Sequence, residues 1–292
     1  MVSANIVNSA VYKRNRKKKG QKLEYAVLMS VYYKERPTSL KESIDSILAQ
    51  TVLPAQFVIV CDGELTPALY EILDMAEAAH SGLFTRVQLA KQSGLGNALN
   101  EGMKYCRYEY IARMDSDDIS CPDRMETELF LLKEKNADLV SGAVAEFETD
   151  SAIIGKIRKL PQTQEEILRF ARRRNPFNHP CVMYKKSMVL KAGGYQPFEG
   201  FEDYYLWLRM LKSGATGYNT ERILLYMRTD GMYKRRGGIK YAGRILRFRN
   251  LMLKKGYCSL KDYLISVTLH VGVSLLPDGV RRLIYDSMLR KK

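Results

Sequence analysis

The chain has 292 residues, of which 46% are hydrophobic and 27% are charged, a composition typical of a globular protein and not of a disordered tail. This length accommodates one large α/β domain with a smaller appendage. The formal net charge of +15, concentrated in residues 13–19 and 234–292, indicates an anionic partner: a phosphate-rich ligand, nucleic acid or an anionic membrane surface.

The N-terminal residues show no secretory signal pattern, and we expect residues 1–22 to form a flexible basic leader of a cytoplasmic protein. The five cysteines are scattered without C-x-x-C spacing and are odd in number. This pattern favours neither a zinc knuckle nor a disulfide framework, and it fits a reducing compartment.

Strands and helices alternate through the first half of the chain. Residues 26–31 form an apolar run typical of a buried strand, and a capping-box pattern at Ser39 predicts a helix over residues 40–48. Further strands are expected at 57–61, 86–89 and 110–114, and helices at 96–105, at 122–135 and from Thr66-Pro67. This alternation predicts a mostly parallel open sheet flanked by helices, which binds ligands beyond the carboxyl ends of its strands.

The second half has a mixed pattern. The expected elements are strands at 139–145 and 182–184, helices at 165–172 and 202–212, and two helical stretches after residue 241. We expect a catalytic domain over 23–235, with a nucleotide-binding half at 23–120, an acceptor half at 121–235, and C-terminal helices at 236–292.

Three carboxylates follow the strand at 110–114 in the sequence Asp115-Ser116-Asp117-Asp118. Such crowding suits a hard divalent cation, Mn²⁺ or Mg²⁺, which would bridge the phosphate oxygens of a nucleoside diphosphate. The alternative is a solvated acidic turn in which Asp118 caps the next helix. A further carboxylate, Asp62, ends an apolar strand and either binds a base or ribose or belongs to an ordinary Asp-Gly turn.

A third acidic site, Glu202-Asp203, opens the helix at 202–212. Acidic residues stabilise the first turn of a helix, but a carboxylate that faces a pocket there is also well placed as a general base. His179, one of three histidines, lies in a proline-rich loop. It either lines the pocket or touches the metal, or it is a structural residue.

Several enzyme classes lack their markers. The segment from Gly94 to Leu99 matches neither a Rossmann nor a P-loop pattern. G-x-S-x-G and H-E-x-x-H are also absent from the sequence, which argues against a hydrolase triad and a zinc peptidase.

The motifs, in this order, resemble those of glycosyltransferase family 2, whose members have the GT-A fold. The resemblance covers residues 23–228. The matching segments are 29–32, the strand ending at Asp62, 94–102, 115–118, Glu202-Asp203 and 206–209.

The resemblance implies inverting transfer of a hexosyl group from a nucleoside diphosphate sugar, with UDP as the expected nucleotide, to a glycan or lipid-linked saccharide in surface polysaccharide synthesis. It implies that Asp203 is the base and that Asp117 and Asp115 bind the metal. On the donor side it implies Val31, Tyr32, Asp62, Gly94, Asn97, Asp115 and Ser116. Lys91 is a further donor-side candidate, and it departs from the arginine expected near the glycine-rich segment. Around the acceptor pocket it suggests Glu202, His179, Trp207, Arg209 and Arg228, the last of which, like Lys91, offers positive charge.

The C-terminal helices have two interpretations. Residues 263–276 are apolar but fall short of the ~20 residues that a spanning helix needs. Residues 280–292 combine an apolar side with basic residues, a pattern typical of an interfacial helix. We therefore expect a peripheral enzyme on the inner face of the cell membrane, the alternative being helices that pack on the core.

Two other functions fit parts of the sequence. A sugar nucleotidyltransferase would share the metal and the α/β sheet, but the expected glycine-rich phosphate loop and nearby lysine are absent from the sequence. A nucleic-acid-binding protein would explain the basic charge. Neither explains the ordered motifs, and no nucleic acid partner is expected.

Overall fold

The computed structural model describes residues 23–148, 151, 155–229, 237–277 and 279–281. The strands are β1 (Tyr25–Val31), β2 (Gln56–Cys61), β3 (Phe84–Gln88), β4 (Tyr110–Asp115), β5 (Ile119–Ser120), β6 (Leu139–Phe147), β7 (Ile157–Arg158), β8 (Val182–Lys185) and β9 (Gly217–Arg228). The helices are α2 (Pro37–Leu48), α3 (Pro67–Ala79), α4 (Leu95–Tyr105), α5 (Arg124–Glu134), α6 (Gln164–Ala171), the short 3₁₀ segment η2 (His179–Cys181), α7 (Lys186–Lys191), α8 (Glu202–Lys212), α10 (Ile239–Lys254) and α11 (Leu260–Leu275).

The first half of the sheet is parallel, as the alternating pattern predicts. Its strands run in the order β3-β2-β1-β4, and all three pairings are parallel. The register places Val31 beside Cys61 and Ser30 beside Asp115. Asp62 and Asp115 therefore emerge at the same carboxyl edge of the sheet, where an open α/β sheet binds its ligands.

The second half of the sheet is mixed. After β4 the order continues β8-β6-β9-β5, and β7 pairs with β6. β8 is antiparallel to both neighbours, whereas β6 and β9 are parallel. Two parallel strands must be joined by a long crossover, usually a helix, whereas antiparallel strands need none. The antiparallel pairing of β8 therefore fits the irregular order of strands and helices in this half of the sequence.

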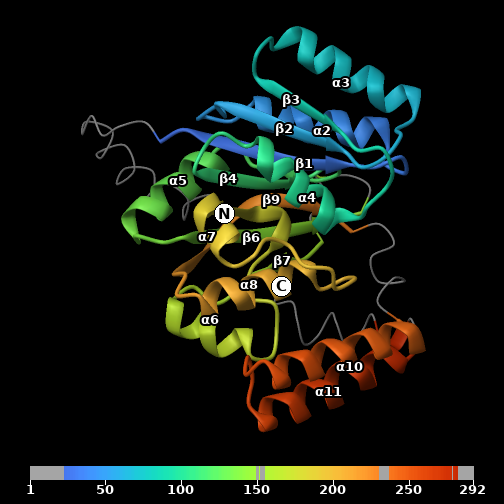
Figure 1. Cartoon of the computed structure of the whole chain (residues 1–292), viewed down its shortest axis with the longest axis vertical. Coiled ribbons are helices and arrows are strands. Elements are labelled where there is room, and N and C mark those ends of the chain that lie inside the picture. Colours follow the sequence, from blue (N-terminus) through green and yellow to red (C-terminus); the bar gives the residue numbers. More distant parts are fainter. Residues whose placement is uncertain (1–22, 149–150, 152–154, 230–236, 278, 282–292) are drawn as a thin grey trace, which may run out of the picture.

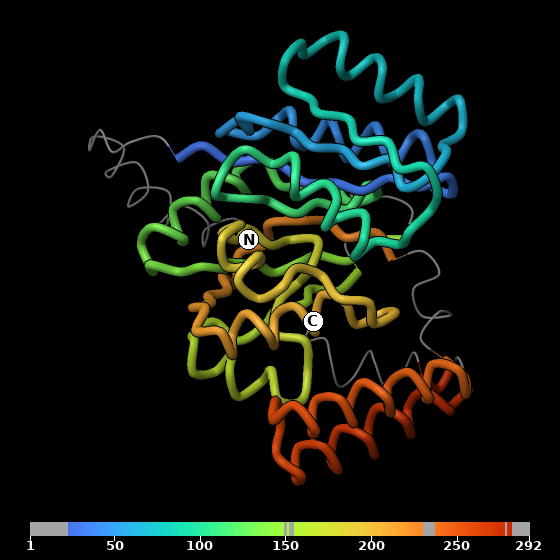
Figure 2. Tube along the Cα trace, in the orientation of Figure 1, coloured from blue at the N-terminus to red at the C-terminus, as the bar shows by residue number. Residues whose placement is uncertain are grey.

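Two hydrophobic clusters cover the sheet, one on each face. Figure 1 shows the helices that contribute to them. α2, α3 and α5 pack on one face through residues such as Leu40, Leu69 and Met125. α4 and α8 pack on the other face, and α10 joins the same layer through Phe248 and Met252. In Figure 2 the α10–α11 hairpin lies at the opposite end of the molecule from α3.

The beginning of α2 differs from the prediction. The helix starts at Pro37 with Arg36 as its N-cap, no side chain caps it, and Ser39 is buried inside its first turn. The capping-box prediction at Ser39 was wrong because Pro37, with its fixed φ and missing N–H, already suits the first helical position. The start of α3 at Pro67 after Thr66 is confirmed.

The predicted basic leader and most of the 280–292 segment lie outside the described residues. Within the described part of the chain, no helix has both the length and the apolar character required to cross a bilayer.

Candidate active site

A cleft of about 800 Å³ begins at the carboxyl edge of β1, β2 and β4 and continues to α10 and α11. It gathers predicted residues from both halves of the chain. Those lining it are Tyr32, Asp62, Gly94, Asp115, Ser116, Asp117, His179, Glu202, Asp203 and Arg228.

Three predicted donor-side residues lie outside the cleft lining. Val31 is fully buried, and its carbonyl accepts the backbone N–H of Asp62 at 2.8 Å. Lys91 and Asn97 are exposed, and the Asn97 amide donates to the Ser93 carbonyl at 2.9 Å. Val31 and Asn97 thus support the backbone around the cleft.

Trp207 and Arg209 also lie outside the cleft lining, contrary to their placement around the acceptor pocket. The Trp207 ring is fully buried and contacts His179 edge-on, with 5.9 Å between ring centroids. Arg209 donates to the Ala192 carbonyl and lies over the Tyr205 ring. Both residues follow the acidic turn along α8, a helix whose later positions are almost all buried.

The carboxylates at the end of β4 form one cluster. One ligand oxygen from each of Asp115, Asp117 and Asp118 lies within 4.8 Å of the others. The fully buried Arg113 guanidinium pairs with Asp115. Glu35 accepts a hydrogen bond from the Ser116 hydroxyl at 2.6 Å, which adds a fourth carboxylate beside the cluster.

The electrostatics of this cluster fit a cation. Burial and the Asp115 and Glu35 carboxylates raise the pKa of Asp117 to about 7. Burial and its acidic neighbours raise the pKa of Asp118 well above its usual range. Asp118 Oδ2 is buried and has no hydrogen-bond partner among the described residues. Oxygen ligands and uncompensated negative charge are what Mn²⁺ or Mg²⁺ requires, so the residues present fit such an ion.

Arg228, at the end of β9, closes the acidic turn. Its backbone N–H donates to Asp118 Oδ1 at 2.8 Å, and its Nε donates to the Asp117 carbonyl at 3.1 Å. Its guanidinium also pairs with Glu42 at 2.7 Å. These contacts hold Arg228 beside the acidic cluster.

Asp62 anchors the glycine-rich loop. Its Oδ1 accepts from the Ser93 N–H at 2.7 Å and the Ser93 hydroxyl at 2.9 Å, and its Oδ2 accepts from the Gly94 N–H at 3.0 Å. Gly94 has a φ of +87°, which favours glycine. Asp62 therefore shapes the wall of the cleft through this loop.

Asp203 lies in the first turn of α8, and the Asn175 amide donates to its Oδ2 at 2.6 Å. Burial raises the pKa of the adjacent Glu202. His179 Nε2 is 2.9 Å from the Tyr195 hydroxyl, and burial together with the Arg113 charge holds the pKa of His179 well below its usual range. His179 is therefore a neutral side chain at neutral pH.

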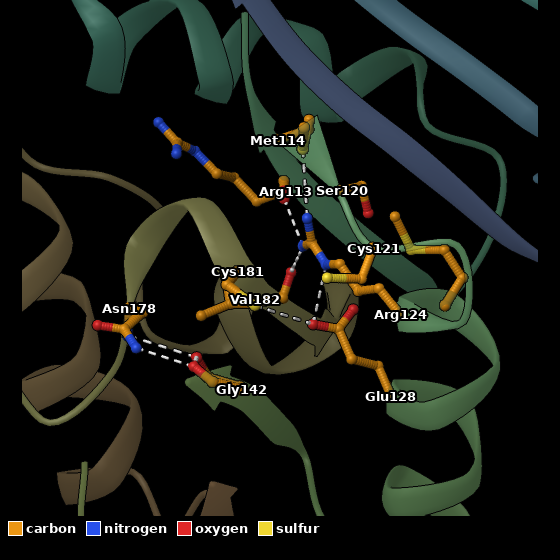
Figure 3. A network of polar contacts seen from close by, with 12 residues as sticks. Arg113, Met114, Ser120, Cys121, Arg124, Glu128, Gly142, Asn178, Cys181 and Val182 are labelled. Atoms are coloured by element: carbon orange, nitrogen blue, oxygen red, sulfur yellow. Dashed lines mark hydrogen bonds and ion pairs between the residues drawn. The ribbon is translucent and has the colours of Figure 1, made fainter. Parts of the chain in front are cut away.

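A buried ion pair supports β4 from the side of α5 (Figure 3). Arg124 contacts Glu128 at 3.1 Å and donates to the Arg113 carbonyl at 2.8 Å and the Met114 sulfur at 3.2 Å. Figure 3 shows the Arg113 side chain pointing away from this network. Arg124 thus fixes the strand from which the acidic cluster emerges.

The structure adds cleft residues that sequence reasoning missed. Arg113 carries the clearest signal, because a charged residue interrupts an otherwise apolar strand. Asn175 and Tyr195 lie in loops without a distinguishing pattern, and only the fold brings them to Asp203 and His179.

The strand order, the acidic turn after β4 and the acidic start of α8, which meet in one cleft, define a GT-A glycosyltransferase. Residues 27–193 match Glycosyl transferase family 2, and the chain belongs to this family. Family membership favours neither the nucleotidyltransferase nor the nucleic-acid-binding hypothesis.

Relatives and a solved structure agree with this assignment. The chain is 36% identical over 271 residues to the UDP-Gal:alpha-D-GlcNAc-diphosphoundecaprenol beta-1,3-galactosyltransferase of Escherichia coli, covering 92% of this chain and 97% of the relative. It is 34% identical over 266 residues to the amylovoran biosynthesis glycosyltransferase AmsE of Erwinia amylovora, covering 90% and 98%. The mannosyltransferase PcManGT from Pyrobaculum calidifontis, solved with GDP-Man and Mn²⁺, superposes with a TM-score of 0.64 at 15% identity, covering 96% and 83%. The last similarity shows the fold alone.

Proposed function

We propose that this enzyme transfers a hexosyl group, with inversion, from a UDP-sugar to a hydroxyl of a lipid-linked saccharide during surface polysaccharide synthesis. The observation that carries the proposal is one cleft lined by both the acidic cluster of β4 and Asp203 of α8. The Escherichia coli relative, whose name specifies a UDP-sugar and a diphosphoundecaprenol-linked acceptor, supports the substrate classes.

On the donor side, Asp115, Asp117 and Asp118 would hold Mn²⁺ or Mg²⁺. Such an ion neutralises the charge that develops on the leaving diphosphate. Tyr32 and Asp62 line the same end of the cleft and would contact the nucleoside, Asp62 through the loop that it anchors.

On the acceptor side, Asp203 would take the proton of the acceptor hydroxyl as its oxygen bonds to the anomeric carbon. The bond from that carbon to the diphosphate oxygen breaks in the same displacement, which inverts the configuration. The Asn175 amide donates to Asp203 Oδ2 and so fixes the orientation of the carboxylate, and Oδ1 would then accept the proton. Glu202 and the neutral His179 complete this wall of the cleft.

We also propose that the enzyme is peripheral, at the inner face of the membrane. Leucines on α10 and α11 are exposed at 40–61% of their surface: Leu246, Leu260, Leu264, Leu269 and Leu275. Exposed apolar helix surface next to basic residues supports binding to anionic bilayers. The test is sedimentation with vesicles that contain anionic lipid. Leu260→Ser with Leu264→Ser should reduce binding, and unchanged binding would contradict the membrane proposal.

Two variants test the catalytic proposal. Asp203→Asn should lower transfer about a hundredfold to ten-thousandfold, the range that general-base catalysis contributes, and leave thermal stabilisation by UDP with Mn²⁺ intact. Asp117→Ala should weaken that stabilisation. Wild-type turnover by Asp203→Asn would remove the assigned base, and Mn²⁺-independent UDP binding would remove the assigned metal site.

A further inference from the structure

The end of the cleft away from the acidic cluster is built by the C-terminal hairpin. Ile245 and Arg249 of α10 and Leu269, His270 and Val273 of α11 line it. The segment after α6 contributes Arg174 to the same wall. The hairpin is therefore part of the cleft, although it lies at the end of the molecule opposite α3 (Figure 1).

Arg249 brings a buried positive charge to this end. It is 2% exposed, and it donates to the Arg173 carbonyl at 2.6 Å and contacts His270 Nδ1 at 3.0 Å. Its other contacts with described residues are the Tyr204 hydroxyl and the Met252 sulfur, so within the described part of the chain its partners are neutral groups. Its Nε is buried without a hydrogen-bond partner among the described residues. A buried guanidinium without an opposite charge is costly, and an anionic ligand would remove that cost.

His270 is a neutral neighbour of this charge. Burial and the positive charges of Arg249 and Arg174 lower the pKa of His270 to about 4. Its Nδ1 accepts from the Arg249 guanidinium, so the ring proton resides on Nε2 and makes His270 a further donor. Two cationic groups and one neutral donor suit a diphosphate.

The same wall is apolar beside the cations. Ile245, Leu269 and Val273 are aliphatic, and Leu269 is 45% exposed, which joins the cleft to the exposed leucines of the hairpin. A free nucleotide has no aliphatic chain that could contact this wall. An amphiphile with an anionic head and an aliphatic tail matches both parts.

We propose that Arg174, Arg249 and His270 bind the diphosphate of a lipid-linked acceptor, with the start of its lipid against the aliphatic wall. The inference rests on the proposed function, because it assigns the acceptor to the end of the cleft opposite the donor. The hairpin then both recognises the acceptor and leads its lipid toward the exposed leucine surface.

The test uses farnesyl diphosphate as a soluble probe, in EDTA and without a sugar donor, with binding measured by calorimetry. The wild-type chain should bind it. Arg174→Gln should weaken binding at least about tenfold, as expected for a charge-assisted contact, whereas Arg172→Gln, an exposed arginine outside the cleft, should not. Leu269→Ser should weaken binding severalfold, and Leu264→Ser, on the same helix but outside the cleft lining, should not.

Binding of UDP with Mn²⁺, measured on the same proteins, separates this inference from the proposed function. A wild-type chain that binds UDP with Mn²⁺ but not farnesyl diphosphate overturns the acceptor site and leaves the donor site standing. A wild-type chain that binds farnesyl diphosphate but not UDP with Mn²⁺ overturns the donor site and leaves the acceptor site standing. Equal affinities for Arg174→Gln and Arg172→Gln, or for the two leucine variants, would also overturn the assignment.

Discussion

Replacing Asp118 by asparagine tests two effects of its charge: repulsion from the other carboxylates of the acidic turn, and the proposed binding of a cation by that turn. The ligand oxygens of Asp115, Asp117 and Asp118 lie within 4.8 Å of one another. At an effective dielectric constant of about 20, two unit charges at that distance repel by about 3.5 kcal/mol, and partial protonation of the turn relieves part of this repulsion. The new side chain keeps an oxygen that can accept the Arg228 N–H. In EDTA we therefore expect Asp118→Asn to gain about 1 kcal/mol of stability, which raises Tm by about 2–4 °C.

Mn²⁺ should reverse this order. An ion at about a hundredfold its Kd stabilises the wild-type chain by about 2.7 kcal/mol, and the variant should lose most of that gain because it lacks one ligand charge. Thermal unfolding at pH 8 with EDTA, with Mn²⁺, and with Mn²⁺ and UDP measures both effects. Asp123→Asn, which removes a surface charge outside the cleft, is the matched control. A lower Tm of Asp118→Asn in EDTA, or an undiminished Mn²⁺ shift, would refute the reasoning.

Three further predictions concern stability. A methyl group at Gly102 would lie 2.5 Å from the Val60 side chain of β2, so Gly102→Ala should lower the free energy of unfolding, measured in urea, by about 1–3 kcal/mol. Gly243→Ala, where the space is open, should raise it by about 0.5–1 kcal/mol. The folded chain depresses the pKa of His270 to about 4, so the unfolded chain takes up the proton first and the contribution of neutral His270 to stability, present above pH 6.5, is lost as pH falls. Between pH 7 and pH 5, the free energy of unfolding of His270→Gln should therefore fall by about 1–2 kcal/mol less than that of the wild-type chain. Trp207→Phe should cost about 1–3 kcal/mol with unchanged substrate KM values, and a selective rise in acceptor KM would restore Trp207 to the acceptor pocket.

The parallel half of the fold and the carboxyl edge of its sheet could be predicted from the sequence. The apolar runs that lead into Asp62 and Asp115 fix the position of both carboxylates, because parallel strands end at a common edge. The GT-A fold expected from the motif order is confirmed. The roles assigned to individual site residues remain predictions.

Contacts between distant loops could not be predicted. Asn175 reaches Asp203 across 28 positions, and the loop that holds Asn175 carries no periodic pattern that would predict its contact with the first turn of α8. Trp207 shows the opposite difference: its place in the motif that follows Glu202-Asp203 predicts a pocket residue, whereas its ring is fully buried in the core. Proximity along a helix does not determine which of its faces borders a cleft.

The closure of the acidic turn by Arg228 has a consequence for synthesis of the chain. The bond from the Arg228 N–H to Asp118 spans 110 positions, so it forms only after β9 has left the ribosome. Until then the nascent chain carries crowded carboxylates without the strand that holds them. The acidic turn therefore acquires its closed geometry late, after the last strand of the sheet has been made.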